Sequence, residues 1–387
     1  MSLLIAGYPY IKENYLKTFD SYPGDVSFLL PKIWKAKGGK LIFKAPIRPN
    51  IYTTRSSFYH SNYPIIGGLL KGWMPFFPLY LLSALGGKKL NLDKVFSSSE
   101  PTLITTLYQG FWAKVFGKKH IIFSWENIPY KQKFKGSKGL IQMFILKLNL
   151  FFCNAIVCGN KKSAEIFSDL TKKPVAIIPL SGVDSDFFKK ENIEHKFRDF
   201  DLGSKVVFTF AGALGYRKGV HLILEAMEAI LKEIPNSHLI IAGSGEYEES
   251  LKLQTTNYKL QAAVTFIPWL DSAGLRELLS ASDVFLYPSI SFGGWEEQFG
   301  YSMAEASLME VPVISTQTGS IEEVVLNGVT GLLIEPDNTK SLTEAMLKLG
   351  RDKNLRDNLG QAGRKYIEEN FSYKVVVDKF YNFFQKI

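Results

Sequence analysis

The chain has 387 residues, of which 46% are hydrophobic and 21% are charged. This composition excludes an intrinsically disordered protein and is typical of a globular one, with two or three domains at about 150 residues each. The two cysteines, Cys153 and Cys158, are too few for a disulfide-stabilised scaffold. Since no basic segment or cleavage site follows Met1, we expect no signal peptide and a cytoplasmic location.

The formal net charge of +9 conceals two halves of opposite sign. Residues 1–190 contain 27 lysines and arginines against 10 acidic residues, whereas residues 191–387 contain 19 against 27. A basic half indicates an anionic partner. In this basic half only two of the cationic residues, Arg48 and Arg55, are arginines, the residue type that favours readout of nucleic-acid bases. We therefore expect that the partner is not a nucleic acid. Lysines beside apolar residues favour an anionic membrane surface instead.

Short apolar runs alternate with segments of helical period through the second half. The expected strands are 206–211, 238–242, 264–267, 284–287, 312–315 and 331–334, and the expected helices include 220–233 and 341–349. Strands that are apolar throughout and separated by helices predict a parallel sheet covered on both faces. This is the pattern of a Rossmann-like domain.

The first half repeats this alternation less regularly. Its expected strands are 3–6, 41–44, 121–124, 155–158 and 175–179. A turn at residues 181–184 separates the halves. We therefore predict an α/β chain of two Rossmann-like domains facing a cleft, one over residues 1–182 and the other over residues 183–372. Such a cleft suits a ligand that has two parts.

Two apolar stretches of the basic half leave alternatives open. Residues 65–85, interrupted by prolines and glycines, fit a buried loop and helix, an interfacial wedge or, less well, a membrane span. Residues 140–152 are apolar on nearly every side, which predicts a buried helix. The preceding lysines, at positions 131, 133, 135 and 138, predict a solvated or lipid-facing lead-in.

Candidate chemistry concentrates in residues 297–305, which follow an expected strand and enter a helix. The first helical turn, from Phe299 to Ser302, should offer unpaired N–H groups that attract phosphate. Along a helix Glu297 and Glu305 are about 12 Å apart, too far to act as a pair on one bond. They suit the two ends of one ligand; otherwise they are an exposed loop acid and a helix-face acid.

Over about residues 175–372 the chain resembles the retaining, nucleotide-sugar-dependent glycosyltransferases of GT-B fold known as family four. The matching motifs are Glu297-Gln298-Phe299-Gly300, Glu305-Ala306, Val311-Pro312-Val313-Ile314, Gly319 to Glu322, and Asn327-Gly328-Val329-Thr330-Gly331-Leu332-Leu333. The resemblance implies that Glu297 contacts the donor sugar and Glu305 the nucleotide ribose. It implies that the backbone of Phe299, Gly300 and Tyr301 holds sugar hydroxyls or phosphate, and that a final helix, 373–387, packs on the first domain.

The resemblance also implies a cation site in residues 212–219. Lys218 matches the family's lysine, whereas Ala213 stands where an arginine is usual, and Arg217 is the expected replacement. Fixed cations stabilise a leaving nucleoside diphosphate without a metal. The alternative is two solvated cations at a helix start, where they oppose the dipole. We expect no metal and no cofactor, since no His or Cys cluster has ligand spacing.

The remaining candidates match the family less closely. Gly243, in the turn after strand 238–242, and Pro268 lie on the expected nucleobase side. Many family members have a histidine after the strand that corresponds to 121–124; here Glu126 follows it, and His120 precedes it and is expected to be structural. Glu126 either serves the acceptor hydroxyl or is a hydrogen-bonded loop carboxylate. Gly24 is the candidate for a phosphate-facing loop after the first strand.

Together these features predict a metal-independent glycosyltransferase, with Glu297, Arg217, Lys218 and Glu126 as its catalytic residues. Its expected partners are a UDP- or GDP-sugar and a glycan or lipid-linked acceptor, with the enzyme peripheral on the cytoplasmic face of a membrane. Because Ala213 and the missing histidine break the family pattern, the alternative is a GT-B module that binds nucleotide sugars or a partner without turnover. A Rossmann oxidoreductase would need a dinucleotide fingerprint, which the sequence lacks.

Overall fold

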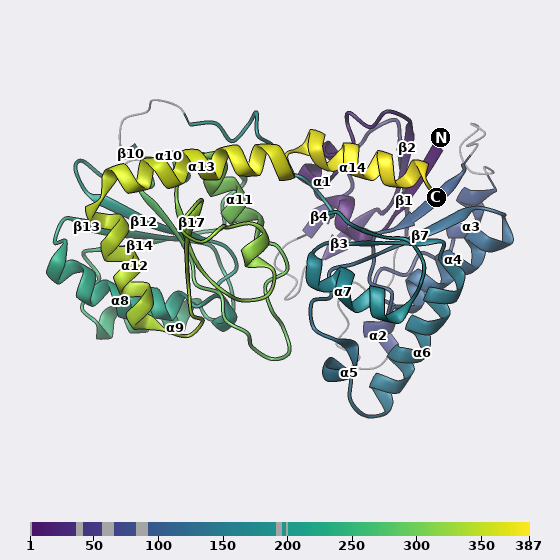
Figure 1. The fold of residues 1–387 in the computed structure, drawn as a ribbon, viewed down its shortest axis with the longest axis horizontal. Helices are drawn as coiled ribbons and strands as arrows, with labels where there is room; N and C mark the ends of the chain where they lie inside the picture. Colours follow the sequence, from purple (N-terminus) through teal and green to yellow (C-terminus); the bar gives the residue numbers. More distant parts are fainter. Residues whose placement is uncertain (1, 36–41, 56–65, 83–91, 191–195, 199) are drawn as a thin grey trace. The chain divides into compact units, whose positions relative to one another are not determined.

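A computed structural model describes residues 2–35, 42–55, 66–82, 92–190, 196–198 and 200–387. The chain forms two compact units (Figure 1). Unit 1 comprises Met1–Gly182 and Tyr373–Ile387, and unit 2 comprises Val183–Ser372. The chain therefore passes from one unit to the other twice.

Unit 1 is built on a parallel sheet whose described strands follow the order β5-β2-β1-β6-β7-β8-β9. These strands are β1 (Ser2–Ala6), β2 (Asp25–Pro31), β5 (Ile51–Thr54), β6 (Lys94–Ser97), β7 (Lys119–Ser124), β8 (Ala155–Cys158) and β9 (Val175–Ile177). The order reverses between β1 and β6, where Ile5 lies opposite Phe28 on one side and Phe96 on the other. A separate antiparallel pair joins β3 (Ile33–Lys35) to β4 (Ile42–Lys44).

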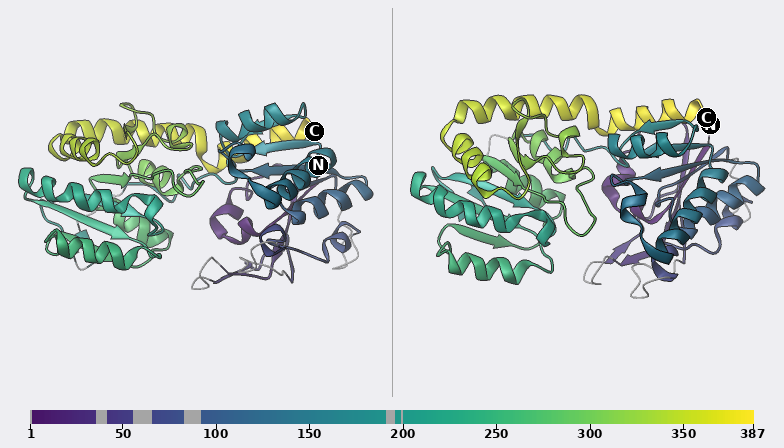
Figure 2. Two further views of the ribbon diagram at one scale, coloured as in Figure 1. Left: turned by 90° about the horizontal axis from the view of Figure 1, so that it is seen from below. Right: turned by 60° about the horizontal axis from the view of Figure 1, so that its bottom comes forward.

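Helices cover both faces of this sheet (Figure 2). The helical segments described in unit 1 are η1 (Tyr8–Ile11), α1 (Glu13–Lys17), α2 (Ile66–Leu69), α3 (Phe77–Leu81), α4 (Ile104–Val115), α5 (Tyr130–Lys133), α6 (Gly136–Phe152), α7 (Lys161–Leu170) and α14 (Tyr373–Gln385). Successive residues of β1 face opposite sides of the sheet: Leu3 and Ile5 pack with α14, whereas Leu4 and Ala6 pack with α3 and α4. Both faces of the strand are thus buried, as the parallel arrangement requires.

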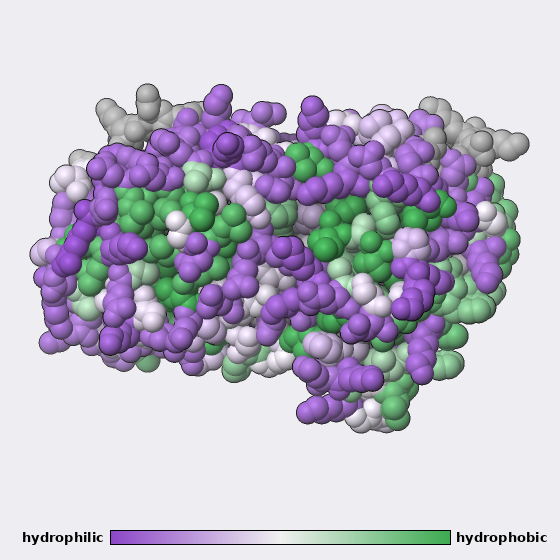
Figure 3. Space-filling view, in the orientation of Figure 1, coloured by the Kyte–Doolittle hydropathy of each residue, from purple (hydrophilic) through white to green (hydrophobic). Residues whose placement is uncertain are grey.

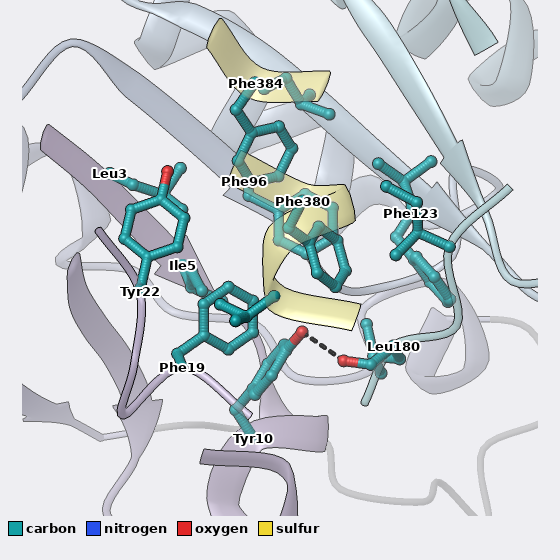
Figure 4. Close-up of a cluster of buried hydrophobic side chains, with 14 of the residues drawn as sticks. Leu3, Ile5, Tyr10, Phe19, Tyr22, Phe96, Phe123, Leu180, Phe380 and Phe384 are labelled. Atoms are coloured by element: carbon teal, nitrogen blue, oxygen red, sulfur yellow. Dashed lines mark hydrogen bonds between the residues drawn. The ribbon is translucent and has the colours of Figure 1, made fainter. Parts of the chain in front are cut away.

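Helix α14 completes the core of unit 1 although it lies nearly two hundred residues from the rest of that unit in sequence. Its buried residues, Val376, Val377, Phe380 and Phe384, recur at the three- and four-residue spacing of one helix face. The rings of Phe380 and Phe384 lie 5.6 and 5.5 Å from the ring of Phe96 (Figure 4). Such contacts tie the C-terminal segment to the sheet of unit 1.

Unit 2 has a parallel sheet whose described strands follow the order β14-β13-β12-β15-β16-β17. They are β12 (Val206–Ala211), β13 (Ser237–Ala242), β14 (Val264–Ile267), β15 (Val284–Tyr287), β16 (Val313–Thr316) and β17 (Gly331–Ile334), and a short hairpin, β10 (Lys196–Phe197) and β11 (Phe200–Asp201), precedes them. The helical segments are η2 (Tyr216–Lys218), α8 (Val220–Glu233), α9 (Glu248–Asn257), α10 (Ser272–Ser280), α11 (Tyr301–Leu308), η3 (Ile321–Glu323), α12 (Thr339–Arg351) and α13 (Lys353–Phe371). The strand order reverses between β12 and β15.

The predicted fold class, α/β with two Rossmann-type parallel sheets, is confirmed. The expected strand at 41–44 is wrong as a member of the main sheet: its described part, β4, pairs only with β3, and residue 41 lies outside the described residues. Strands β2, β5 and β6 were not predicted. In β6 the missing signal has a physical cause, because Lys94 and Ser97 break the apolar pattern and are buried through tertiary contacts.

The two apolar stretches differ from simple core segments. Within the described part of 65–85, Met74 and Phe77 are buried whereas Phe76 and Leu82 are about half exposed. The expectation that 140–152 forms a wholly buried helix is wrong, because α6 leaves several large apolar side chains in solvent. Among the described residues, no helix combines the length and apolar character needed to cross a bilayer.

Candidate functional site

The candidate site lies at the carboxyl edge of the unit 2 sheet, where strand order reverses between β12 and β15. In open α/β sheets the loops that follow such strands turn to opposite sides, and ligands bind where they diverge. Here the two loops are residues 212–219 and 288–300. Of the residues selected from the sequence, these loops contain Arg217, Lys218, Glu297, Phe299 and Gly300.

A buried ion pair between Lys218 and Glu297 joins these two loops. Only 6% of either residue is exposed. The Lys218 ammonium donates to a carboxylate oxygen of Glu297 and to the hydroxyl of Tyr287 at the end of β15. Ser289 donates to the same carboxylate oxygen over 3.3 Å. The pair is therefore embedded in a polar network rather than isolated in the core.

Glycines allow the backbones to approach closely enough for this pair. Gly219, next to Lys218, has a φ of +68°, and a Cβ there would lie 1.9 Å from the Pro288 carbonyl oxygen. Gly319 has a φ of +61°, and its Cβ would lie 2.0 Å from the carbonyl oxygen of Glu297. Any side chain at either position would separate the loops. These contacts give a physical reason for two glycines of the matched motifs.

Burial and pairing act in opposite directions on the two charges. Burial raises the pKa of Glu297, but the charge and hydrogen bond of Lys218 lower it more, so the pKa lies below its ordinary value. Burial lowers the pKa of Lys218, and Glu297 offsets this only in part. Glu297 is therefore held as a carboxylate. An ammonium has three N–H donors, and Glu297 and Tyr287 accept two of them.

Arg217 adds a second cation to the same loop. Its guanidinium carbon lies 3.5 Å from the ring centroid of Trp295, so the planar group stacks on the indole. Its Nη1 atom is buried and has no hydrogen-bond partner among the described residues. A buried, unpaired guanidinium donor is costly unless an anion binds it. The arrangement therefore suits an anionic ligand.

The segment after Glu297 leads into helix α11. Phe299 is buried, Gly300 adopts a φ of +80° before the first helical residue, and Tyr301 and Ser302 form the first turn. Glu305 lies in the second turn and is partly exposed. Because only Tyr301–Leu308 is helical, Glu297 and Glu305 are not on one helix as the distance estimate assumed.

Gly243 and Pro268 lie at the same edge, directly after β13 and β14. Gly243 has a φ of +151°, and a Cβ there would lie 1.9 Å from the Gly212 carbonyl oxygen. It therefore lets the loops after β12 and β13 touch. Pro268 is exposed. The structure thus brings all the candidates of unit 2 to one edge of its sheet.

Tyr287 is a site residue that the sequence analysis missed. Its ring is buried, its hydroxyl accepts from Lys218, and it also interacts with Glu297 and Ser302. The available signal was its position, since it is the last residue of an otherwise apolar strand beside the point where strand order reverses. A phenol at the carboxyl end of such a strand faces the ligand edge.

In unit 1, Glu126 follows β7 and is buried, with its carboxylate 2.6 Å from the ammonium of Lys133. Glu100, which follows β6, was missed because that strand was not predicted. Its two oxygens accept from the Ser124 hydroxyl and the Trp125 N–H, each over 2.8 Å. Burial raises the pKa of Glu100 to about 7, and the nearby carboxylate of Glu126 adds to this. Glu100 therefore positions the loop that carries Glu126.

The assignment of Gly24 to a loop after the first strand is wrong. Gly24 directly precedes β2, and Ser2 at the start of β1 lies opposite Asp25, so Gly24 is at the amino edge of the sheet. The residue that follows β1 is Gly7, where a Cβ would lie 2.1 Å from the hydroxyl oxygen of Ser98, just after β6. His120 is buried within β7 and hydrogen-bonds Ser97. Burial lowers its pKa to about 3, which keeps the ring neutral.

Comparisons with known proteins agree with this geometry. The family model for glycosyl transferases group 1 matches residues 192–366. The capsular polysaccharide biosynthesis glycosyltransferase CapM of Staphylococcus aureus is 28% identical over 65% of this chain and 67% of its own length. A GDP-mannose-dependent monoacylated alpha-(1-6)-phosphatidylinositol monomannoside mannosyltransferase of Corynebacterium glutamicum is 31% identical, but the match covers only 44% of each chain.

Among solved structures, HepE of Anabaena in complex with UDP and glucose is similar over the full length of both chains, with a TM-score of 0.75 and 15% identity. Sucrose-phosphate synthase of Thermosynechococcus elongatus gives a TM-score of 0.74 at 16% identity, over 100% of this chain and 98% of that one. At these identities the likeness establishes the fold, which is GT-B.

Among the described residues, no group of three His, Cys, Asp or Glu side chains could hold a metal ion.

The ion pair predicts the effect of removing one partner. Lys218→Met leaves the Glu297 carboxylate buried without its counter-ion, so we expect a loss of about 3 to 5 kcal/mol in the free energy of unfolding. Lys218→Met combined with Glu297→Gln should be more stable than Lys218→Met alone. Denaturant titration measures both. Lys232→Met, which removes a lysine from an exposed pair with Glu228, is the control, and an equal loss in that variant contradicts the prediction.

Glu100 predicts a pH dependence of stability. Because its pKa is raised in the folded state to about 7, the protein binds a proton more tightly when folded, and stability falls as the pH rises from about 5 to about 8. Glu100→Gln should remove up to about 3 kcal/mol of this fall. Urea titrations across that pH range test it, with Glu165→Gln on the exposed side of α7 as the control. Parallel curves for wild type and Glu100→Gln would be the contrary result.

Proposed function

We propose that the chain is a retaining, metal-independent hexosyltransferase, and the match of residues 192–366 to the family model for glycosyl transferases group 1 supports this. It moves a sugar from a UDP- or GDP-sugar to an acceptor hydroxyl and needs no cofactor. Unit 2 binds the donor and unit 1 binds the acceptor. The observation that carries the proposal is the buried pair of Lys218 and Glu297 where strand order reverses. Beside it lies the Nη1 atom of Arg217, which is buried and has no hydrogen-bond partner in the part of the chain that the structure describes.

In the donor site, Lys218 and Arg217 bind the diphosphate. Glu297 binds hydroxyls of the sugar, and Glu305 binds the ribose. The N–H groups at the start of α11, from Phe299 to Ser302, hold the remaining phosphate or sugar oxygens, while Gly243 and Pro268 border the base.

The transfer breaks the bond between the anomeric carbon and the diphosphate oxygen and forms one to the acceptor oxygen on the same face of the sugar. The acceptor's proton leaves with the nucleoside diphosphate. As that bond breaks, negative charge grows on the leaving group, and the fixed cations of Lys218 and Arg217 stabilise it. Glu126, held by Lys133 and by the loop that Glu100 positions, orients the acceptor hydroxyl.

The proposed acceptor is a lipid-linked or membrane-surface glycan, reached from the cytoplasmic face. The excess of lysine in residues 1–190 supports this, since it suits an anionic surface. Two of the relatives carry names that refer to a capsular polysaccharide and to a phosphatidylinositol mannoside. These names support an acceptor of that class without identifying it.

The donor site predicts which ligands stabilise the protein. In EDTA, one of UDP, GDP and ADP should raise the melting temperature and NAD should not; at about a hundred times its Kd a ligand adds about 2.7 kcal/mol. Glu305→Ala should lose this shift, because the ribose loses its carboxylate partner. Glu344→Ala, on the exposed side of α12, should retain it. The donor site is contradicted if no diphosphate shifts the melt at millimolar concentration.

Turnover separates the proposed transferase from a GT-B module that only binds. The module is the second candidate because Ala213 replaces the usual arginine and no histidine follows β7. On prolonged incubation with the nucleotide sugar that stabilises it, the wild type should release the nucleoside diphosphate, and Lys218→Met should not. A wild type that binds the donor and leaves it intact is the binding module.

A further inference from the structure

Helices α4 and α6 of unit 1 pack side by side and leave large apolar side chains uncovered. On α4, Phe111 and Val115 are exposed by 45% and 53%. On α6, Leu140, Phe144 and Phe151 are exposed by 74%, 62% and 65%. Hydrophobic residues, drawn green, gather on this side of unit 1 in Figure 3, where Figure 1 labels the two helices. An exposed apolar surface of this kind indicates an interaction site.

The exposed side chains form a stripe on α6. Leu140, Phe144, Lys147 and Phe151 recur at spacings of four, three and four residues, which places them on one helix face. The opposite face is anchored in the core of unit 1, where Leu146 is buried and the Asn149 amide donates to the Pro101 carbonyl over 2.8 Å. The stripe is therefore not needed to hold the helix in place.

The charges on the two helices that form this face have one sign. Helices α4 and α6 themselves carry three lysines, at positions 114, 138 and 147, and no acidic residue. The Lys114 ammonium lies 4.5 Å from the ring centroid of Phe151, between the two helices. Lys138 and Lys147 are exposed on α6 itself. Cations and large apolar groups are thus interleaved on one surface.

We propose that this α4–α6 face, formed by Phe111, Lys114, Val115, Leu140, Phe144, Lys147 and Phe151, binds the surface of an anionic lipid bilayer. Apolar side chains enter the boundary between headgroups and acyl chains, while the lysines reach the lipid phosphates. A second copy of the chain suits the face poorly, because it would bring lysines against lysines without an acidic partner. The inference rests on the proposed function, which supplies the membrane-bound acceptor, and it adds the face of unit 1 that contacts the membrane.

Flotation of the full chain with lipid vesicles tests the proposal. The wild type should float with vesicles of phosphatidylcholine and phosphatidylglycerol at low salt. It should float far less with phosphatidylcholine alone or in about 0.5 M salt, which screens the lysines. Leu140→Ser combined with Phe144→Ser should lower the partition coefficient about tenfold, which corresponds to about 1.4 kcal/mol. Leu253→Ser, at a residue exposed by 62% on α9 of unit 2, should leave it unchanged.

Two further comparisons separate the specific face from general charge. Lys114→Gln with Lys147→Gln should weaken flotation, whereas Lys232→Gln with Lys353→Gln, the same loss of charge in unit 2, should not. Because the substituted side chains are largely exposed, the variants should fold. Their melting temperatures and their stabilisation by a nucleoside diphosphate check this and test the donor site independently of any membrane.

Three results would overturn the proposal. The first is that the wild type does not float with anionic vesicles. The second is that the α4–α6 variants float as well as the wild type. The third is that the control variants lose as much binding as the α4–α6 variants do. A face between two copies is the competing outcome: in light scattering without lipid, Phe144→Ser would then convert a dimer to a monomer. Since the vesicles hold neither donor nor acceptor, none of these results bears on donor binding.

Discussion

The buried pair of Lys218 and Glu297 is the interaction on which the rest of the proposed donor site depends. Two charges in a protein interior lose their hydration, and only close pairing with further hydrogen bonds compensates for that loss. Tyr287 and Ser289 supply those hydrogen bonds, and Gly219 and Gly319 permit the backbone approach. The sheet contributes the position, because the pair links the loops after two adjacent strands, β12 and β15. A diphosphate would enter a site whose cations are already held in place.

The two units divide the electrostatic tasks. At one edge of its sheet, unit 2 fixes Lys218 and Glu297 by pairing them and holds Arg217 over the ring of Trp295. Unit 1 instead carries an excess of lysines, of which those on α4 and α6 lie among exposed aromatic side chains. A fixed, directional arrangement suits one small anion. A diffuse arrangement suits a surface of many anions, which needs no particular geometry.

Sequence reasoning succeeded where local pattern determines structure. The strands of unit 2, such as 206–211 and 284–287, are apolar throughout, because both faces of a parallel sheet are buried. It failed where a distant contact decides. Lys94 in β6 is buried, and its ammonium donates to the carbonyl of Phe384, which lies nearly three hundred residues away in the sequence. Because β6 was not predicted, Glu100 could not be placed near Glu126 from the sequence.

The wrong assignments have equally specific causes. Gly24 has the composition of a turn, but only the parallel pairing of β1 with β2 shows that it lies at the amino edge of the sheet. The apolar run at 140–152 predicts burial, yet no element of unit 1 covers its outer face among the described residues. Tyr287 was predicted correctly as part of a strand, but its role in the site was missed because that role depends on Lys218, which lies 69 residues away in the sequence.

The most direct test of whether the Lys218–Glu297 pair marks the donor site is hydrogen exchange. It is measured with and without the nucleoside diphosphate that stabilises the protein. The account predicts slower amide exchange in residues 212–219 and 297–303 when the diphosphate is bound. It predicts no change in residues 258–263, which precede β14 at the opposite edge of the same sheet. Protection confined to other segments, or none in the two loops, would contradict it.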